Sequence, residues 1–216
     1  MISIICVYNN PELLIGNLLK GLSNQSVPYQ FIGIPNISNT LFKKIPSALN
    51  YGANFAAGDY LAFIHQDVYL PNSDWLVNTE KILNDTRDLN KDLGIAGVAG
   101  VTQKGERLGH LKHIDFHYGE FVDIPKYIQC LDEQVLIVPK DVFNKVKFDE
   151  RFSFHFYGHD YSLAVTEIQL RAYVIEAYVH HNTPCTNIKG NDFLGEKRKF
   201  FEKWEKLGIE IKTMVG

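Results

Sequence analysis

Short apolar runs alternate with segments of helical period through the first half of the chain, and this alternation most constrains the fold. Residues 2–8 form an almost unbroken run of strand-forming residues, as expected for a strand buried on both faces of a parallel sheet. Similar runs follow at 29–34, 59–64 and 94–101. The order β-α-β-α-β-α-β predicts a single α/β domain with a mostly parallel sheet flanked by helices.

The segments between the runs carry helix signals. Asn10 is a capping residue, Pro11 takes a favourable first helical position and Glu12 is an acid in the first turn. Leu14, Leu18 and Leu22 then form an apolar stripe. Further helices are predicted over 47–57, from Ser73 past residue 83, and over 139–146, 159–170 and 191–207, with strands over 130–138 and 172–181. Residues 102–127 are rich in Gly, His and charge and are predicted to form a long functional loop or hairpin.

The composition of the chain limits the classes of molecule and the compartment that we expect for it. The 216 residues carry a formal net charge of −3 and are 22% charged, so nothing attracts the whole chain to nucleic acid. Three cysteines without a C-x-x-C pair favour a reducing compartment, and neither a signal peptide nor a membrane-spanning run is found in the sequence, so we expect a cytoplasmic protein. The basic, aromatic segment 197–206 indicates either contact with the inner membrane surface or a helix docked on the domain. Its interspersed acids favour docking, so membrane contact is at most peripheral.

Polar residues appear abruptly after the apolar run 59–64, as His65-Gln66-Asp67. Ligands of open α/β sheets bind at the carboxyl ends of strands, and a carboxylate there is well placed to hold a divalent cation. The alternative is a solvated turn. His180 and His181 end another predicted strand and point to opposite faces, so at most one can be a ligand of the same ion. His110, His113 and His117 would make a zinc face only on a helix, and their segment lacks a helical period.

Asp160 lies in the first turn of a predicted helix, after the aromatic segment 152–158. A carboxylate beside such a segment can act as a general base toward an acceptor hydroxyl. The alternative is an acid that only favours the helix N-terminus. Other motifs are absent: the sequence has no phosphate-binding G-x-x-x-x-G-K-[ST], no G-x-G-x-x-G after the first strand, no G-x-S-x-G and no H-E-x-x-H.

Together these segments resemble the family-2 glycosyltransferases, which have the Rossmann-like GT-A fold. The opening strand ends in Tyr-Asn-Asn, and A-x-N-x-G and A-x-G-D-Y motifs precede the strand that ends in His-Gln-Asp-Val. An F-D-E-x-F segment over 148–152, His159-Asp160 and the late histidines are similar to the acceptor half of the family. His65 replaces the first acid of the usual D-x-D motif, and Asn36 follows the second strand, where relatives usually carry Asp.

The resemblance implies a role for each residue. Asp67 would hold Mn²⁺ or Mg²⁺, with His180, or alternatively His181, completing the shell. Asp160 would be the catalytic base, with Asp132 or Glu133 in reserve, and Asp67→Asn and Asp160→Asn would each abolish transfer. The predicted donor-binding residues are Tyr8, Asn10, Asn36, Asn50 and Gln66.

The implied reaction is transfer, with inversion, from a UDP-sugar or GDP-sugar to a glycan, lipid-linked or protein acceptor. Residues 1–190 would form the transferase domain, with a donor half over 1–101 and an acceptor half over 102–190, and residues 191–216 a C-terminal helix. The main alternative is a catalytically inactive GT-A-like domain that binds a glycan or nucleotide. A nucleotidyltransferase ranks last, because residues 9–12 lack its Gly-rich basic loop.

Overall fold

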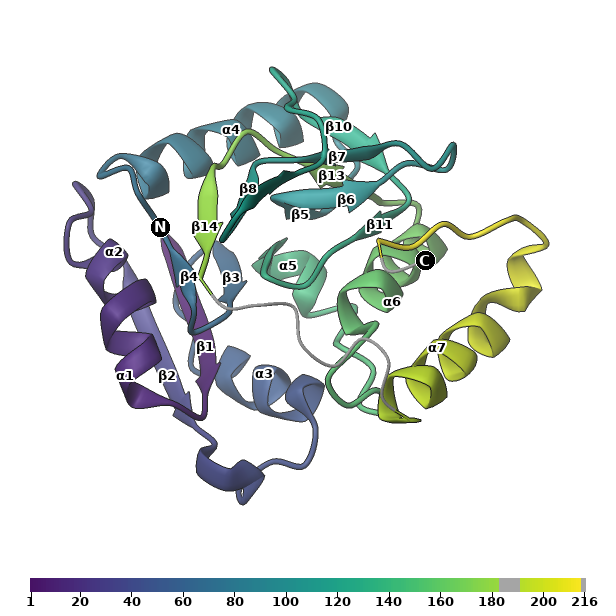
Figure 1. Ribbon diagram of the computed structural model, residues 1–216. Coiled ribbons are helices and arrows are strands. Elements are labelled where there is room, and N and C mark those ends of the chain that lie inside the picture. The colour runs from purple at the N-terminus through teal and green to yellow at the C-terminus, as the bar shows by residue number, and fades with distance from the viewer. Residues whose placement is uncertain (183–190, 215–216) are drawn as a thin grey trace.

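A seven-stranded sheet forms the centre of the computed structural model, which describes residues 1–182 and 191–214 (Figure 1). Its spatial order is β10 (Lys126–Ile128), β13 (Arg171–Val174), β5 (Leu93–Gly97), β12 (Val135–Pro139), β3 (Tyr60–Ile64), β1 (Ile2–Tyr8) and β2 (Gln30–Pro35). β1 is parallel to β2 and β3, β13 is parallel to β5, and β12 is antiparallel to both β3 and β5. In this sheet only β12 and β10 therefore run against the common direction, because β10 is antiparallel to β13. The predicted α/β fold with a mostly parallel sheet is confirmed.

Two smaller sheets lie beside the central one. One contains β11 (Cys130–Leu131), β6 (Ala99–Val101) and β7 (Arg107–Gly109); the other contains β4 (Val68–Tyr69), β14 (Val179–His181), β8 (Leu111–His113) and β9 (Phe116–Tyr118). The predicted strands 94–101, 130–138 and 172–181 are therefore wrong as single strands. Each divides in two, because the chain leaves the central sheet for a small one, or the reverse. The expected hairpin within 102–127 is present as β8 and β9.

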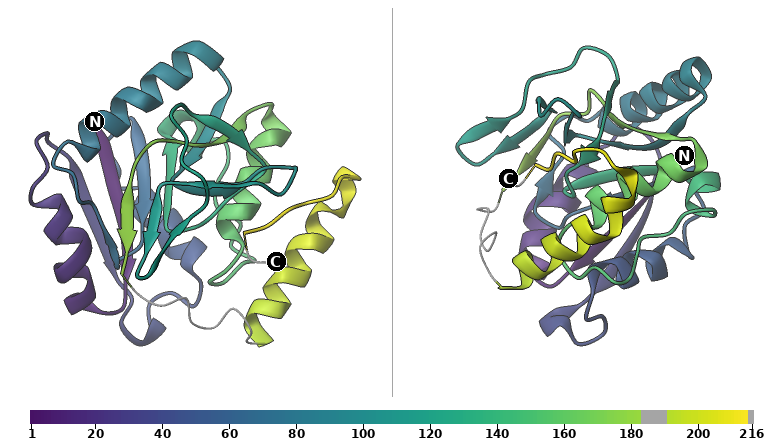
Figure 2. Two further views of the ribbon diagram at one scale, coloured as in Figure 1. Left: turned by 45° about the horizontal axis from the view of Figure 1, so that its top comes forward. Right: turned by 90° about the vertical axis from the view of Figure 1, so that its right-hand side faces the viewer.

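The first helical segment begins as predicted. The Asn10 side chain accepts hydrogen bonds from the N–H groups of Glu12 and Leu13 at the start of α1 (Pro11–Leu14). The helix continues through a π-helical turn (Ile15–Leu19) into α2 (Lys20–Leu22). α3 (Ile45–Ala53) begins before Ser47 and ends before the predicted residue 57. α1 and α3 lie on opposite sides of β1 (Figures 1 and 2).

The remaining helices are α4 (Trp75–Asn90), α5 (Lys140–Phe143), α6 (Tyr157–Ala164) and α7 (Asn191–Trp204), with 3-10 turns at Ile37–Asn39, Val165–Ile168 and Glu205–Leu207. The N-cap of α4 is Asp74, not Ser73. α7 is docked on the domain, as the acidic residues interspersed in its sequence indicate. It lies beside α6 (Figures 1 and 2) and buries the side chains of Phe193, Phe200 and Trp204. Within 1–182 and 191–214, none of the helices is long and apolar enough to cross a membrane.

Candidate active site

A cavity of about 190 Å³ lies at the carboxyl ends of β1 and β3, where the sequence predicts a ligand site. Tyr8 ends β1, and His65, Gln66 and Asp67 follow β3. β12 runs the other way, with Val135 opposite Ile64. Its first residues therefore lie at the edge of the sheet where β1 and β3 end, and residues just before it reach the same cavity.

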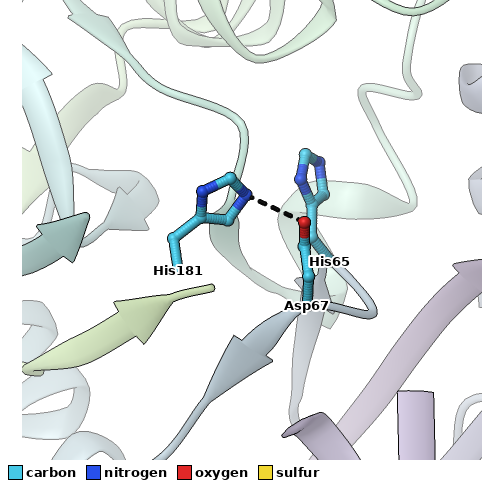
Figure 3. Close-up of side chains that lie close together, drawn as sticks. All are labelled: His65, Asp67 and His181. Carbon is cyan, nitrogen blue, oxygen red and sulfur yellow. Dashed lines mark ion pairs between the residues drawn. The ribbon is translucent and has the colours of Figure 1, made fainter. Parts of the chain in front are cut away.

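Three side chains from two segments, the turn after β3 and strand β14, meet beside this cavity. His65, Asp67 and His181 each offer a ligand atom, and these atoms lie within 4.8 Å of one another (Figure 3). Nε2 of His181 is 3.2 Å from Oδ2 of Asp67. Antiparallel pairing of β4 with β14 sets His181 opposite Val68, the residue after Asp67. In the part of the chain that the structure describes, this is the one group of His, Cys, Asp and Glu side chains that could hold a metal ion.

His180 lies on the other face of β14. Its ring packs against Tyr69, at 6.0 Å between centroids, and against Tyr178 at 5.3 Å. The preference for His180 as the metal ligand is therefore corrected in favour of His181. The reason is the two-residue period of a strand, which lets only one of two neighbouring side chains face Asp67.

His65, which is half-buried, pairs with Tyr157, the first residue of α6. Nε2 of His65 is 2.9 Å from the Tyr157 hydroxyl. Burial lowers the pKa of His65, although Asp67 opposes the shift, so the ring is neutral at pH 7. Burial, with nearby carboxylates such as Glu133 and Asp132, raises the pKa of Tyr157 well above its usual value. The pair is thus an uncharged wall of the cavity.

Glu133 lines the cavity from the segment before β12 and is 8% exposed. The N–H of Gly158 donates to its Oε1 at 3.2 Å, and Nδ1 of His159 lies 3.9 Å from the same oxygen. A Cβ at position 158 would approach Cγ of Glu133 to 2.8 Å, so a glycine is needed there. The carboxylate therefore lies at the N-terminus of α6, which favours negative charge. Asp132 instead accepts the N–H of Glu133 at 2.9 Å.

Asp160 does not lie where the sequence predicts it. Its side chain is 2% exposed, accepts the indole N–H of Trp204 at 2.8 Å, and pairs with the Lys203 ammonium group at 2.6 Å. Successive helical residues are about 100° apart, so Asp160 points almost opposite to Gly158, which faces Glu133. Burial raises the pKa of Asp160, with Lys203 opposing the shift. The expectation that Asp160 faces Asp67 across a cleft is therefore corrected: Asp160 joins α6 to α7.

The predicted donor-binding residues divide into two groups. Tyr8, Asn36 and Gln66 line the cavity. Asn10 caps α1, and Asn50 donates to the Phe148 carbonyl at 2.9 Å, outside the cavity lining.

Two of these side chains hold loops in place. Oε1 of Gln66 accepts the N–H groups of Asn9 and Asn10 at 3.1 and 3.0 Å, which ties the end of β1 to the end of β3. Both ends of the Asn36 amide bond the backbone of Phe42, at 2.9 Å each.

Some lining residues are not among those predicted from the sequence. Asn9, Phe154 and Tyr157 also contact the cavity. Asn9 follows the first strand, and Phe154 and Tyr157 lie in the aromatic segment 152–158. Tyr157 is also the first residue of α6, which starts two residues earlier than predicted.

Solved structures with the same arrangement of a mostly parallel sheet and flanking helices are glycosyltransferases, and the chain has their GT-A fold. S. aureus TarS matches with a TM-score of 0.62 and 13% identity over 98% of this chain and 40% of its own. The mannosyltransferase PcManGT from Pyrobaculum calidifontis, in complex with GDP-Man and Mn²⁺, matches with a TM-score of 0.65 and 12% identity over 98% of this chain and 65% of its own.

GalNAc-T7, with UDP, GalNAc and Mn²⁺, matches with a TM-score of 0.66 and 10% identity over 96% of this chain and 49% of its own. The chain thus spans between 40% and 65% of the length of these three proteins. Neither a protein-family model nor a curated protein matches the sequence. At these identities the comparison establishes the fold.

Proposed function

We propose that the chain is a metal-dependent glycosyltransferase that moves a sugar from a nucleotide-sugar donor to an acceptor hydroxyl. The observation that supports this function most directly is the pair of Asp67 and His181. Together with His65, the pair forms a group of side chains that could bind a metal ion beside the cavity at the end of β3. Ligands of open α/β sheets bind at this edge. The complexes of similar structures with GDP-Man or UDP and Mn²⁺ support the same reaction class.

The donor set fits a divalent cation. A carboxylate oxygen and an imidazole nitrogen suit Mn²⁺, and Mg²⁺ accepts the carboxylate. The distance of 3.2 Å between Oδ2 of Asp67 and Nε2 of His181 matches neighbouring positions of an octahedral shell, in which bonds of about 2.2 Å place adjacent ligands about 3 Å apart. A cation held by these two residues would supply positive charge to stabilise the leaving diphosphate. His65, neutral at pH 7, adds no charge of its own.

Tyr8, Asn36 and Gln66 are the residues we assign to the nucleotide of a UDP-sugar or GDP-sugar. Asn10 and Asn50 support this pocket from outside, the first as the cap of α1 and the second through its bond to Phe148. We assign residues 1–101 to the donor half, 102–190 to the acceptor half and 191–216 to a C-terminal segment, of which Asn191–Trp204 form the docked helix α7. The proposed acceptor is a glycan, a lipid-linked molecule or a protein.

We assign the catalytic base to Glu133 in place of Asp160. Oε1 of Glu133 is held by the Gly158 N–H, so Oε2 is the oxygen that takes the proton from the acceptor hydroxyl. That hydroxyl attacks the anomeric carbon as the nucleoside diphosphate leaves on the opposite side, and a single displacement of this kind inverts the configuration. Residue 133 belongs to the proposed acceptor half.

The test begins with a thermal-shift screen of UDP-sugars and GDP-sugars with and without Mn²⁺, because a bound ligand raises the melting temperature by mass action. The donor it selects is then assayed for release of nucleoside diphosphate. We expect metal-dependent release that Asp67→Asn abolishes. Asp85→Asn is the matched control, because Asp85 pairs with Lys81 on the exposed side of α4. Donor binding without any release in the presence of acceptor glycans would favour an inactive binding domain instead.

A further inference from the structure

The β8–β9 hairpin places His113 beside the proposed metal ligand His181, on the side of the ring away from Asp67. β8 pairs in parallel with β14, and the register sets His113 opposite His181. Nε2 of His113 lies 3.1 Å from Nδ1 of His181, and the two rings meet edge-on at 4.7 Å between centroids. Both side chains are buried, at 3% and 7% exposure. The His181 ring is thus held between Asp67 on one side and His113 on the other.

Without a cation, a backbone donor indicates the direction of these hydrogen bonds. The backbone N–H of Ile114 points at Nδ1 of His113, at 3.3 Å. A neutral imidazole has one donor and one acceptor nitrogen, so His113 accepts at Nδ1 and donates from Nε2 to Nδ1 of His181. By the same rule His181 carries its proton on Nε2, which faces Oδ2 of Asp67 at 3.2 Å.

His113 is itself held in place. Phe116, on the neighbouring strand of the hairpin, stacks on the His113 ring with 5.1 Å between centroids and 12° between the planes. A contiguous series therefore runs from Phe116 through His113 and His181 to Asp67. An imidazole with no partner at Nδ1 is free to rotate about its Cβ–Cγ bond, which would turn Nε2 away from the carboxylate.

We propose that His113 is a positioning residue that orients His181 for the cation, an inference that rests on the metal site of the proposed function. Histidine ligands of metal ions almost always donate their second ring N–H to a fixed acceptor. With a cation at Nε2, the proton of His181 is on Nδ1 and the acceptor is Nε2 of His113. Both rings then have the opposite tautomer, and the number of bound protons is unchanged. Cation binding therefore reverses the hydrogen bond between the two rings and gives up the bond from the Ile114 N–H to Nδ1 of His113.

The experiment measures the affinity of the purified full chain for Mn²⁺ by electron paramagnetic resonance, without any sugar nucleotide. His113→Phe keeps an aromatic ring against Phe116 but removes the nitrogen that faces His181. His113→Gln keeps an acceptor at a similar reach. We expect the dissociation constant to rise about 10- to 100-fold in His113→Phe and to stay within about threefold of wild type in His113→Gln.

His117→Phe is the matched control. His117 lies on the same hairpin and bonds the Gly119 carbonyl at 3.0 Å, so the same substitution there should leave Mn²⁺ affinity unchanged. Melting temperatures of all variants without Mn²⁺ test whether the hairpin stays folded. As a second measurement, ¹⁵N NMR should find His181 with its proton on Nε2 in wild type and in His117→Phe, and a mixture of tautomers in His113→Phe.

Wild-type Mn²⁺ affinity in a folded His113→Phe variant would overturn the inference, and so would equal losses in His113→Phe and His113→Gln. Mn²⁺ binding that depends on His113 in a protein that releases no nucleoside diphosphate would support it while the proposed function fails. A wild-type chain that binds no Mn²⁺ at millimolar concentration overturns both.

Discussion

Replacing Asp160 with asparagine should leave transfer nearly unchanged, whereas replacing Glu133 with glutamine should abolish it. The asparagine amide would keep an oxygen for the indole N–H of Trp204, now 2.8 Å from Asp160. Lys203 would keep its ion pair with Asp149 at 2.7 Å, and its side chain is 19% exposed. Since burial raises the pKa of Asp160, its charge is not favoured there. We therefore expect the free energy of unfolding to change by less than about 1 kcal/mol.

The melting temperature reports this change, at about 2–4 °C per kcal/mol for a chain of this size. Asp160→Ala is the companion variant, because it leaves the buried indole N–H of Trp204 without an acceptor. Such an unsatisfied donor costs about 1–3 kcal/mol. A clear fall in melting temperature for alanine but not for asparagine would identify Asp160 as a residue that joins α6 and α7.

Glu133→Gln keeps an oxygen for the Gly158 N–H, which donates to Oε1 at 3.2 Å, so the fold should be retained. The loss of a general base lowers the turnover number about 10²- to 10⁴-fold. The assay is release of nucleoside diphosphate from the donor that the thermal-shift screen selects. An Asp160→Asn variant that melts like wild type but loses turnover a hundredfold would restore Asp160 as the base and refute this reasoning.

Three further predictions follow from the same contacts. Burial lowers the pKa of His110. Below about pH 6.5, the ordinary pKa of an unfolded histidine, the unfolded chain therefore takes up the proton first, and the free energy of unfolding should fall as the pH drops toward the folded pKa. Urea titrations should find this fall in wild type and a weaker pH dependence over the same range in His110→Gln. Gln66→Leu removes the acceptor of the Asn9 and Asn10 N–H groups and should weaken donor binding about tenfold, as one to two hydrogen bonds would, in calorimetric titrations. Trp204→Ala removes a fully buried side chain and should lower the free energy of unfolding by about 3–5 kcal/mol, measured by chemical denaturation.

Patterns confined to one segment predict their local structure well. The cap, proline and acid at Asn10, Pro11 and Glu12 predict the start of α1, because all three act within one helical turn. The abrupt change after the run 59–64 predicts the end of β3 and places Asp67 at a site, because strand ends in such sheets meet at one edge.

Features that depend on pairing between distant segments are not visible in the sequence. The sequence of an apolar run such as 130–138 does not reveal whether the strand will be parallel or antiparallel to its neighbours. β12 is antiparallel to β3, and this direction brings Glu133 to the cavity. The two-residue period leaves open which of His180 and His181 faces Asp67, because only the register with β4 decides it. His113 has no signal of its own, since its partner lies 68 positions away along the chain.

The small sheet β4-β14-β8-β9 connects these observations. It joins the turn after β3 to two segments of the second half, so the proposed cation ligands come from its strand pairing as well as from the motif His65-Gln66-Asp67. A histidine at the first acid of D-x-D therefore need not mean an inactive site. Nε2 of His65 contacts the Tyr157 hydroxyl. His181, whose Nδ1 contacts His113, offers its Nε2 as a ligand atom beside Asp67. The shorter carboxylate of an aspartate at position 65 would lose the contact of His65 with the Tyr157 hydroxyl and place a charge in a half-buried position, where it is costly unless paired. His65→Asp should therefore lower both Mn²⁺ affinity and the melting temperature.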